Sequence, residues 1–158
     1  MLTITVDDSA FRQYLSLLQE RLGDLTEPMG DIGQALETRI RNRFESKTDP
    51  AGAAWAPWAD STLRSYPWPG SKAAENDDGP GEGQILIRYR ALLQGISHEP
   101  DSTSVRVGFD QDYAKFHEFG TKKMPRRGLL FDDPDAGKLA ADDERAVLDV
   151  LEHWLGLT

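Results

Sequence analysis

Residues 28–46 have the sequence PMGDIGQALETRIRNRFES, and this stretch decides the fold of the 158-residue chain. Its apolar side chains recur three and four residues apart, which places them on one side of a helix. These residues are Met29, Ile32, Leu36, Ile40 and Phe44. Proline is tolerated in the first turn of a helix, so the helix is expected to begin near Pro28. The stretch therefore predicts one long amphipathic helix.

Segments on both sides of this helix predict β-structure. Residues 2–6 alternate in polarity and are rich in β-branched side chains, so they predict a short strand. Residues 94–98 and 104–108 are expected to pair as a hairpin, because Pro100-Asp101 favours a turn between them.

Further helices are expected before and after the long one. Residues 9–22 have helical spacing, and Gly23 is a plausible end. Short helices are expected near residues 61–64 and over 113–119, the second closed by Gly120. A final helix should run from about Asp142 to Leu155, with an acidic first turn that suits the helix dipole. Its buried face is expected to contain Val147, Leu148, Leu151, Trp154 and Leu155.

The composition is that of one ordinary domain covering residues 1–158. The formal charge of −9 argues against a surface that coats nucleic acid. The chain has no cysteine, which excludes disulfide frameworks, thiol catalysis and Cys-ligated metals. No run of about 18 apolar residues occurs, and the N-terminus lacks the features of a signal peptide. We therefore expect a cytoplasmic protein with no membrane segment and no specific nucleic acid.

Residues 67–84 differ in composition from the rest of the chain. They are rich in proline, glycine, serine and acidic residues, with almost no large apolar side chain. Such a segment cannot bury enough surface to offset the entropy of ordering it. It predicts a long mobile loop inserted in the domain.

Charge is distributed unevenly in the C-terminal half. Residues 132–152 hold eight acids and two bases, whereas residues 113–128 hold five bases and one acid. An acidic protein with one local basic loop suits a specific docking surface better than polyanion binding. The five bases are Lys115, Lys122, Lys123, Arg126 and Arg127.

No residue pattern indicates catalysis, a metal or a cofactor. The three histidines have no metal-ligand spacing, and no P-loop, G-x-S-x-G or G-x-G-x-x-G motif occurs. His117 and Glu118 are adjacent, and adjacent side chains on a helix point about 100° apart. His117 is therefore expected to pack half-buried rather than to hold a metal or transfer a proton. A hydrolase or nuclease stays open as an alternative that would require a divalent cation.

Three tryptophans are candidates for core or contact positions. Trp55 and Trp58 lie among alanines and prolines, and such aromatics either pack on a core or meet a partner. Core packing is favoured for Trp55, while Trp58 fits either role. Trp68, between Pro67 and Pro69, is the best candidate for an exposed contact.

Five segments, taken in order, resemble the phage virion morphogenesis family, the tail-completion proteins of Mu-like phages and prophages. No single segment is specific, but their common order makes chance resemblance improbable. The resemblance covers roughly residues 10–155. The segments are Arg43-Phe44, residues 49–58 with Trp55, residues 86–96, residues 113–121 with Tyr113, Phe116, His117 and Gly120, and residues 124–130 with Pro125.

The chain departs from the family pattern at a few positions. Tyr89 and Arg90 stand where the family has Thr-Gly, which puts the local turn there in question. Gly95 replaces a common serine, and Leu129 replaces a frequent phenylalanine. The segment 67–84 resembles an insertion relative to shorter members.

The resemblance implies an α+β fold in which a small antiparallel sheet packs against a long helix, with additional N- and C-terminal helices. The elements expected from the residues agree with that fold. It also implies a structural, non-enzymatic protein at the neck or head-proximal tail end, which completes the tail and permits head–tail joining. Its partners would be tail and neck or connector proteins and further copies of itself in a ring, expected to be sixfold. Assembly would occur in the host bacterial cytoplasm, and the protein would then stay in the virion.

On this hypothesis the candidate assembly residues are Trp58, Trp68, Lys122, Lys123, Arg126 and Arg127. The basic turn would pair with an acidic surface, such as residues 132–144 of a neighbour. Reversing the charges of Arg126 and Arg127 is expected to abolish assembly and leave the monomer folded. The alternatives are a tail-terminator ring and a prophage-derived soluble adaptor.

Overall fold

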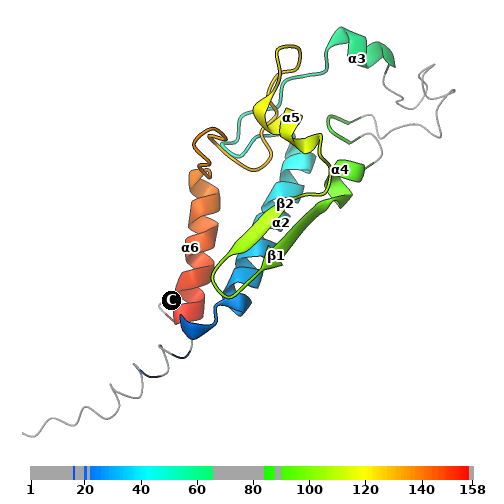
Figure 1. Cartoon of the computed structure of the whole chain (residues 1–158). Coiled ribbons are helices and arrows are strands. Elements are labelled where there is room, and N and C mark those ends of the chain that lie inside the picture. Colours follow the sequence, from blue (N-terminus) through cyan, green and yellow to red (C-terminus); the bar gives the residue numbers. More distant parts are fainter. Residues whose placement is uncertain (1–15, 17–19, 21, 66–83, 88–89, 157–158) are drawn as a thin grey trace, which may run out of the picture.

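The long helix α2 (Thr26–Ser46) is the element around which the others are arranged in the computed structural model (Figure 1). The structure describes residues 16, 20, 22–65, 84–87 and 90–156. Asp24 precedes α2 and its Oδ1 accepts a hydrogen bond of 2.9 Å from the Thr26 N–H. The helix ends at Lys47, whose left-handed backbone directs its N–H to the Arg43 carbonyl. The predicted long helix is confirmed and begins two residues before Pro28.

The two described strands form an antiparallel hairpin, β1 (Ile96–Pro100) and β2 (Val105–Phe109). Asp101 forms the turn between them, because its Oδ1 accepts the N–H groups of Thr103 and Ser104, each at 2.8 Å. Hydrogen bonds from the Ser104 hydroxyl and from these two N–H groups lower the pKa of Asp101 to about 2. The hairpin was predicted correctly, with each strand starting one or two residues later than expected.

The hairpin packs along one side of α2 (Figure 1). A Cβ on Gly33 would lie 2.4 Å from the His98 ring and 2.9 Å from Val105, so glycine permits this close approach. One helical turn further on, Glu37 Oε2 lies 2.7 Å from His98 Nδ1. Glu37 also accepts hydrogen bonds from Arg41, and these, followed by the His98 contact, lower the pKa of Glu37.

Helix α6 (Ala141–Leu155) packs against α2 through a buried ion cluster. Asp143, only 1% exposed, accepts a hydrogen bond of 2.6 Å from Arg39 Nε and a second one from Arg43 Nη2. Arg43 Nη1 also donates to the Leu129 carbonyl at 2.7 Å. A charged side chain is tolerated in the protein interior only when it is paired with an opposite charge and hydrogen-bonded. The cluster therefore fixes which face of α6 meets α2.

The predicted buried face of α6 is wrong at Leu148, whose side chain is 49% exposed. Asp143 must face the arginines of α2, and residues one turn apart share a face. The inward positions thus follow Asp143 to Val147 and Val150, and Leu148 turns about 100° away from Val147. The half-buried apolar residues of the helix are Val147, Val150, Leu151, Trp154 and Leu155.

The apolar core lies at the C-terminal end of α2. It consists of Ile40, Phe44, Trp55, Ile87, Leu92, Ile96 and Leu129. The Phe44 and Trp55 rings meet edge to face at 5.5 Å, a favourable aromatic geometry. Trp55 Nε1 donates to the Gly128 carbonyl at 3.1 Å, so its polar atom is satisfied.

The described part of the chain has three further short helices. They are α3 (Asp60–Ser65), α4 (Ala91–Gln94) and α5 (Ala114–Phe119). Helix α4 contributes Leu92 to this core, and α5 packs Ala114 against it. The predicted strand at 2–6 and the loop at 67–83 lie outside the described residues, as does most of the predicted helix at 9–22. No helix within the described ranges combines the length and the apolar character needed to cross a membrane.

Candidate assembly surface

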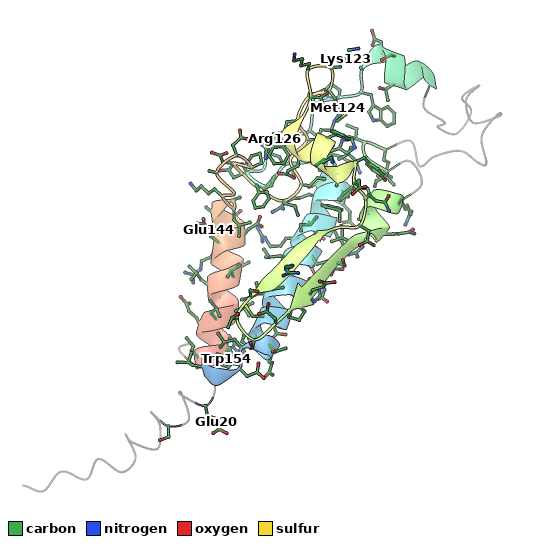
Figure 2. All side chains as sticks on the ribbon, in the orientation of Figure 1. Glu20, Lys123, Met124, Arg126, Glu144 and Trp154 are labelled. Atoms are coloured by element: carbon green, nitrogen blue, oxygen red, sulfur yellow. The ribbon has the colours of Figure 1, made fainter. Side chains whose placement is uncertain are left out.

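Helix α5 and the basic turn, which we define as residues 121–128, lie at one end of the molecule (Figures 1 and 2). Thr121 and Met124 close the turn, with the Thr121 N–H donating to the Met124 carbonyl at 2.8 Å. Lys122 and Lys123 lie at its tip and are exposed. The tip of the turn therefore exposes two ammonium groups at the surface.

Gly120 allows the chain to turn back after α5. Its backbone has φ +72 and ψ 179, a conformation that is almost restricted to glycine. A Cβ there would also lie 2.9 Å from the Arg126 backbone nitrogen. The Arg127 N–H then donates to the His117 carbonyl at 2.8 Å, and this hydrogen bond holds the second half of the basic turn against α5.

Glu118 is the anchor of this region, and it is only 4% exposed. Its Oε2 accepts the N–H groups of Leu129 at 2.7 Å and Leu130 at 2.9 Å, and its Oε1 accepts that of Phe131 at 3.0 Å. Three backbone donors on one carboxylate fix the chain that follows the basic turn. Sequence analysis gave Glu118 no role, because a glutamate on a short helix is normally solvated.

Arg126 and Arg127 are held within the chain. Arg126 Nε donates to the Glu118 carbonyl at 2.8 Å, and its Nη2 donates to the Phe131 carbonyl. Arg127 is 7% exposed and donates from Nε to the Ala56 carbonyl and from Nη2 to the Pro57 carbonyl, each at 2.9 Å. The expectation that reversing both charges leaves the monomer folded is therefore corrected. Each arginine satisfies part-buried backbone carbonyls that a carboxylate would repel.

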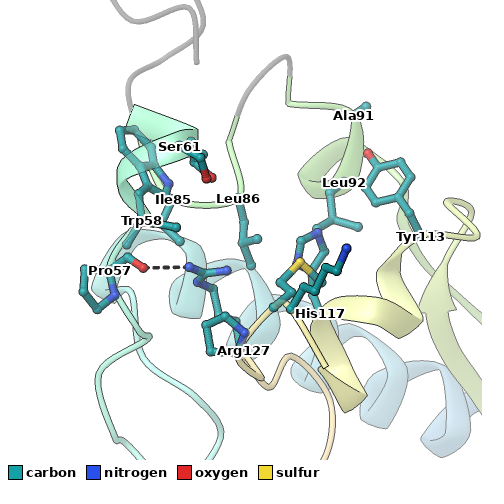
Figure 3. Close-up of a pocket in the computed structure, with 15 residues that line it drawn as sticks. Pro57, Trp58, Ser61, Ile85, Leu86, Ala91, Leu92, Tyr113, His117 and Arg127 are labelled. Atoms are coloured by element: carbon teal, nitrogen blue, oxygen red, sulfur yellow. Dashed lines mark hydrogen bonds between the residues drawn. The ribbon is translucent and has the colours of Figure 1, made fainter. Parts of the chain in front are cut away.

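A cavity of about 550 Å³ opens between α3, α4, α5 and the basic turn (Figure 3). Its walls are mainly apolar and include Trp58, Leu86 and Leu92. The polar residues His117 and Arg127 also line it. A mainly apolar cavity with a few polar groups is typical of a binding site.

His117 is half-buried, and its Nδ1 has no hydrogen-bond partner among the described residues. Burial, and then the charge of Arg127, lower the pKa of His117, so the imidazole is neutral at pH 7. The Tyr113 ring meets it edge-on at 6.2 Å. No group of three or more His, Asp or Glu side chains in the described part of the chain has a geometry that could hold a metal ion.

The outer face of α5, defined as Tyr113, Lys115, Phe116 and Phe119, exposes three aromatic rings. Phe116 is 47% exposed and Phe119 is 55% exposed. Lys115 Nζ lies 5.4 Å from the centre of the Phe116 ring, a cation–π distance. Sequence analysis missed Phe119, although its spacing of three from Phe116 places both on one side of a helix.

The other sequence-predicted residues lie in different surroundings. Phe44 and Trp55 lie in the core, and Trp58 is half-buried in the cavity wall. Pro125 is exposed at the cavity rim. Trp68 lies outside the described residues.

The sequence profile of the phage virion morphogenesis family matches residues 6–156 of the chain. No curated protein and no solved structure matches the chain at a significant level. The match spans α2, the hairpin, α5, the basic turn and all of α6.

Proposed function

Because the chain belongs to the phage virion morphogenesis family, we propose that it completes the phage tail at its neck or head-proximal end and so permits head–tail joining. A structural role in building a phage particle follows from the family itself. The finer assignment to tail completion is supported by the resemblance of the five sequence segments to tail-completion proteins.

The observation that carries this proposal is the surface at the α5 end of the molecule. It combines exposed aromatic rings with the exposed Lys122 and Lys123 of the basic turn. Exposed aromatic and cationic side chains on a fixed backbone are typical of contact sites between proteins. Glu118 and Gly120 fix that backbone, so little ordering is required when a partner binds.

The proposed mechanism is binding without a chemical step. Lys122 and Lys123 would meet an acidic surface on a tail or neck protein, or on another copy in a ring. Complementary charges of this kind set the rate and register of encounter more than the affinity. Assembly would take place in the host cytoplasm before the protein becomes part of the virion.

Electron microscopy of particles from an induced lysogen that lacks this gene tests the proposal. We expect filled heads beside unattached tails of normal length. Tails of uncontrolled length would instead assign the protein as a tail terminator. Intact, infectious particles would refute any role in the virion and favour a soluble adaptor.

Complementation in the same strain tests the basic turn. A Lys122→Ala/Lys123→Ala variant is expected to restore fewer joined particles than wild type. Lys138→Ala, which removes an exposed lysine outside the turn, serves as the matched control. Full restoration by the double variant would exclude the two lysines as contact residues.

A further inference from the structure

We propose that the outer face of α5 and the basic turn that follows it in one copy bind the outer face of α6 in the next copy, in a head-to-tail contact. This inference rests on the proposed function, because it supplies the contact that would link copies in a ring. It names a second copy of this chain as the partner of the aromatic surface.

The α5 side of the contact is apolar at its centre and cationic at its border. Phe116 and Phe119 are exposed, and a cavity of about 280 Å³ lies beside Phe119. The apolar residues around that cavity include Phe109, Ala114, Leu129, Leu130 and Phe131. Exposed rings beside a hollow of this kind accept an aliphatic side chain from a partner.

The α6 side has the opposite charge and a matching apolar group. Leu148 lies at the middle of the outward face of α6, and about half of its side chain is exposed. The charged residues on and around this face are four acids and one base, namely Asp142, Glu144, Asp149, Glu152 and Arg145. Arg145 Nη2 lies 2.8 Å from Asp149 Oδ1, so part of that negative charge is already paired.

The buried charged side chains have partners within the chain, so the exposed charged side chains decide the sign of the α5 and α6 surfaces. Glu118, Arg126 and Arg127 have internal partners, which leaves the exposed Lys115, Lys122 and Lys123 as the cations of the α5 end. Two exposed acids, Asp110 and Asp112, lie just before α5. Asp143 is likewise paired inside, while its acidic neighbours on α6 face outward. Three outward lysines thus face a predominantly acidic helix surface, which favours encounter in one register.

The two faces lie apart on the molecule, as Figure 2 shows for Lys123 at one end and Glu144 and Trp154 along α6. One copy therefore offers one face to each of two neighbours. A contact between different faces is heterologous, and it propagates into a closed ring or an open chain. The arrangement accounts for an assembly with more than two copies.

Charge reversal on each face separately tests the contact. The first variant is Lys122→Glu/Lys123→Glu, and the second is Asp149→Lys/Glu152→Lys. Each is expected to weaken self-association at least about tenfold in sedimentation velocity, because the reversed residues then face residues of the same charge across the contact. An equimolar mixture is expected to regain association, since each variant then has an oppositely charged face to meet in the other.

The apolar centre is tested by Leu148→Ser. Loss of one buried leucine is expected to weaken self-association by about 10- to 100-fold. Leu22→Ser serves as the control, because Leu22 is an equally exposed leucine outside both faces. Arg106→Glu/Lys138→Glu is the matched charge control, with two exposed cations outside the contact. Circular dichroism shows whether each variant is folded.

Three results would overturn the inference. The first is a wild-type chain that stays monomeric at about 1 mM, a concentration at which even a contact of about 4 kcal/mol is half-formed. The second is dissociation of the charge-control variants to the same extent as the charge-reversed variants. The third is an equimolar mixture of the two charge-reversed variants that stays monomeric. The deletion phenotype tests the proposed function without using either face. A head–tail joining defect together with a failed mixture would therefore remove only this contact.

Discussion

Replacing Glu118 by glutamine is expected to destabilise the fold by about 3 kcal/mol. Both carboxylate oxygens of Glu118 accept backbone N–H groups: Oε2 accepts those of Leu129 and Leu130, and Oε1 accepts that of Phe131. The amide nitrogen of glutamine must face at least one of these donors, and a buried N–H left unsatisfied costs about 1–3 kcal/mol. The other two hydrogen bonds then have a neutral acceptor in place of a charged one, and together they lose roughly 1 kcal/mol or more of stabilisation.

Urea and thermal unfolding followed by circular dichroism measure this loss. For a chain of this length, about 3 kcal/mol corresponds to a fall in Tm of roughly 6–12 °C. Glu45→Gln is the matched control, because Glu45 is exposed on α2 and its replacement is expected to change stability by less than about 0.5 kcal/mol. A loss below about 1 kcal/mol for Glu118→Gln would refute the reasoning, since it would mean that the three N–H groups find other acceptors.

Three further perturbations test the backbone and the hairpin turn. Gly120→Ala is expected to cost about 2 kcal/mol or more in urea unfolding, whereas Gly137→Ala, at φ +64 with open space around it, should cost only about 1 kcal/mol. Arg90 has φ +60 where the family pattern has glycine, so Arg90→Gly should be more stable than Arg90→Ala by about 1 kcal/mol, because both lose the side chain and only glycine relieves the backbone; equal stability of the two variants would contradict the backbone explanation. The depressed pKa of Asp101 means that its contribution to stability is complete above its usual pKa of 3.8 and is lost as the pH falls through about 2. An NMR titration should find that pKa near 2, and Ser104→Ala should raise it; an unchanged value would exclude the hydroxyl as the main cause.

The helix α2 and the hairpin were predictable because their apolar and turn residues follow regular rules. The spacing from Met29 to Phe44 and the turn around Asp101 are local patterns, and local patterns survive folding. The turn near Arg90 was in question, because Tyr89 and Arg90 stand where the family has Thr-Gly. Arg90 adopts a left-handed backbone conformation, which glycine adopts more easily than arginine.

The buried charges were not predictable in this way. Asp143 was expected to suit the dipole of α6 from the solvent, and it lies inside because Arg39 and Arg43 meet it from a helix about 100 residues earlier. Glu118 and Arg127 are buried for a similar reason, since N–H and carbonyl groups from neighbouring loops satisfy them. A prediction from hydrophobic periodicity places every charged side chain in water. It therefore did not place Asp143 on the inner face of α6, and for the same reason it wrongly placed Leu148 there.

The ion cluster between α2 and α6 also has a consequence for synthesis on the ribosome. Arg43 lies 100 residues before Asp143, so its partner is made about 5–20 s later at ordinary rates of translation. During that interval the arginine has to stay hydrated, because burying it without a counter-ion costs several kcal/mol. The contacts of Glu118 with Leu129, Leu130 and Phe131 span only 11 to 13 residues and form as soon as that part of the chain emerges. The surface that carries the basic turn is thus built before α2 and α6 are joined, and emergence of Asp143 from the ribosome is the step that allows α6 to pack against α2.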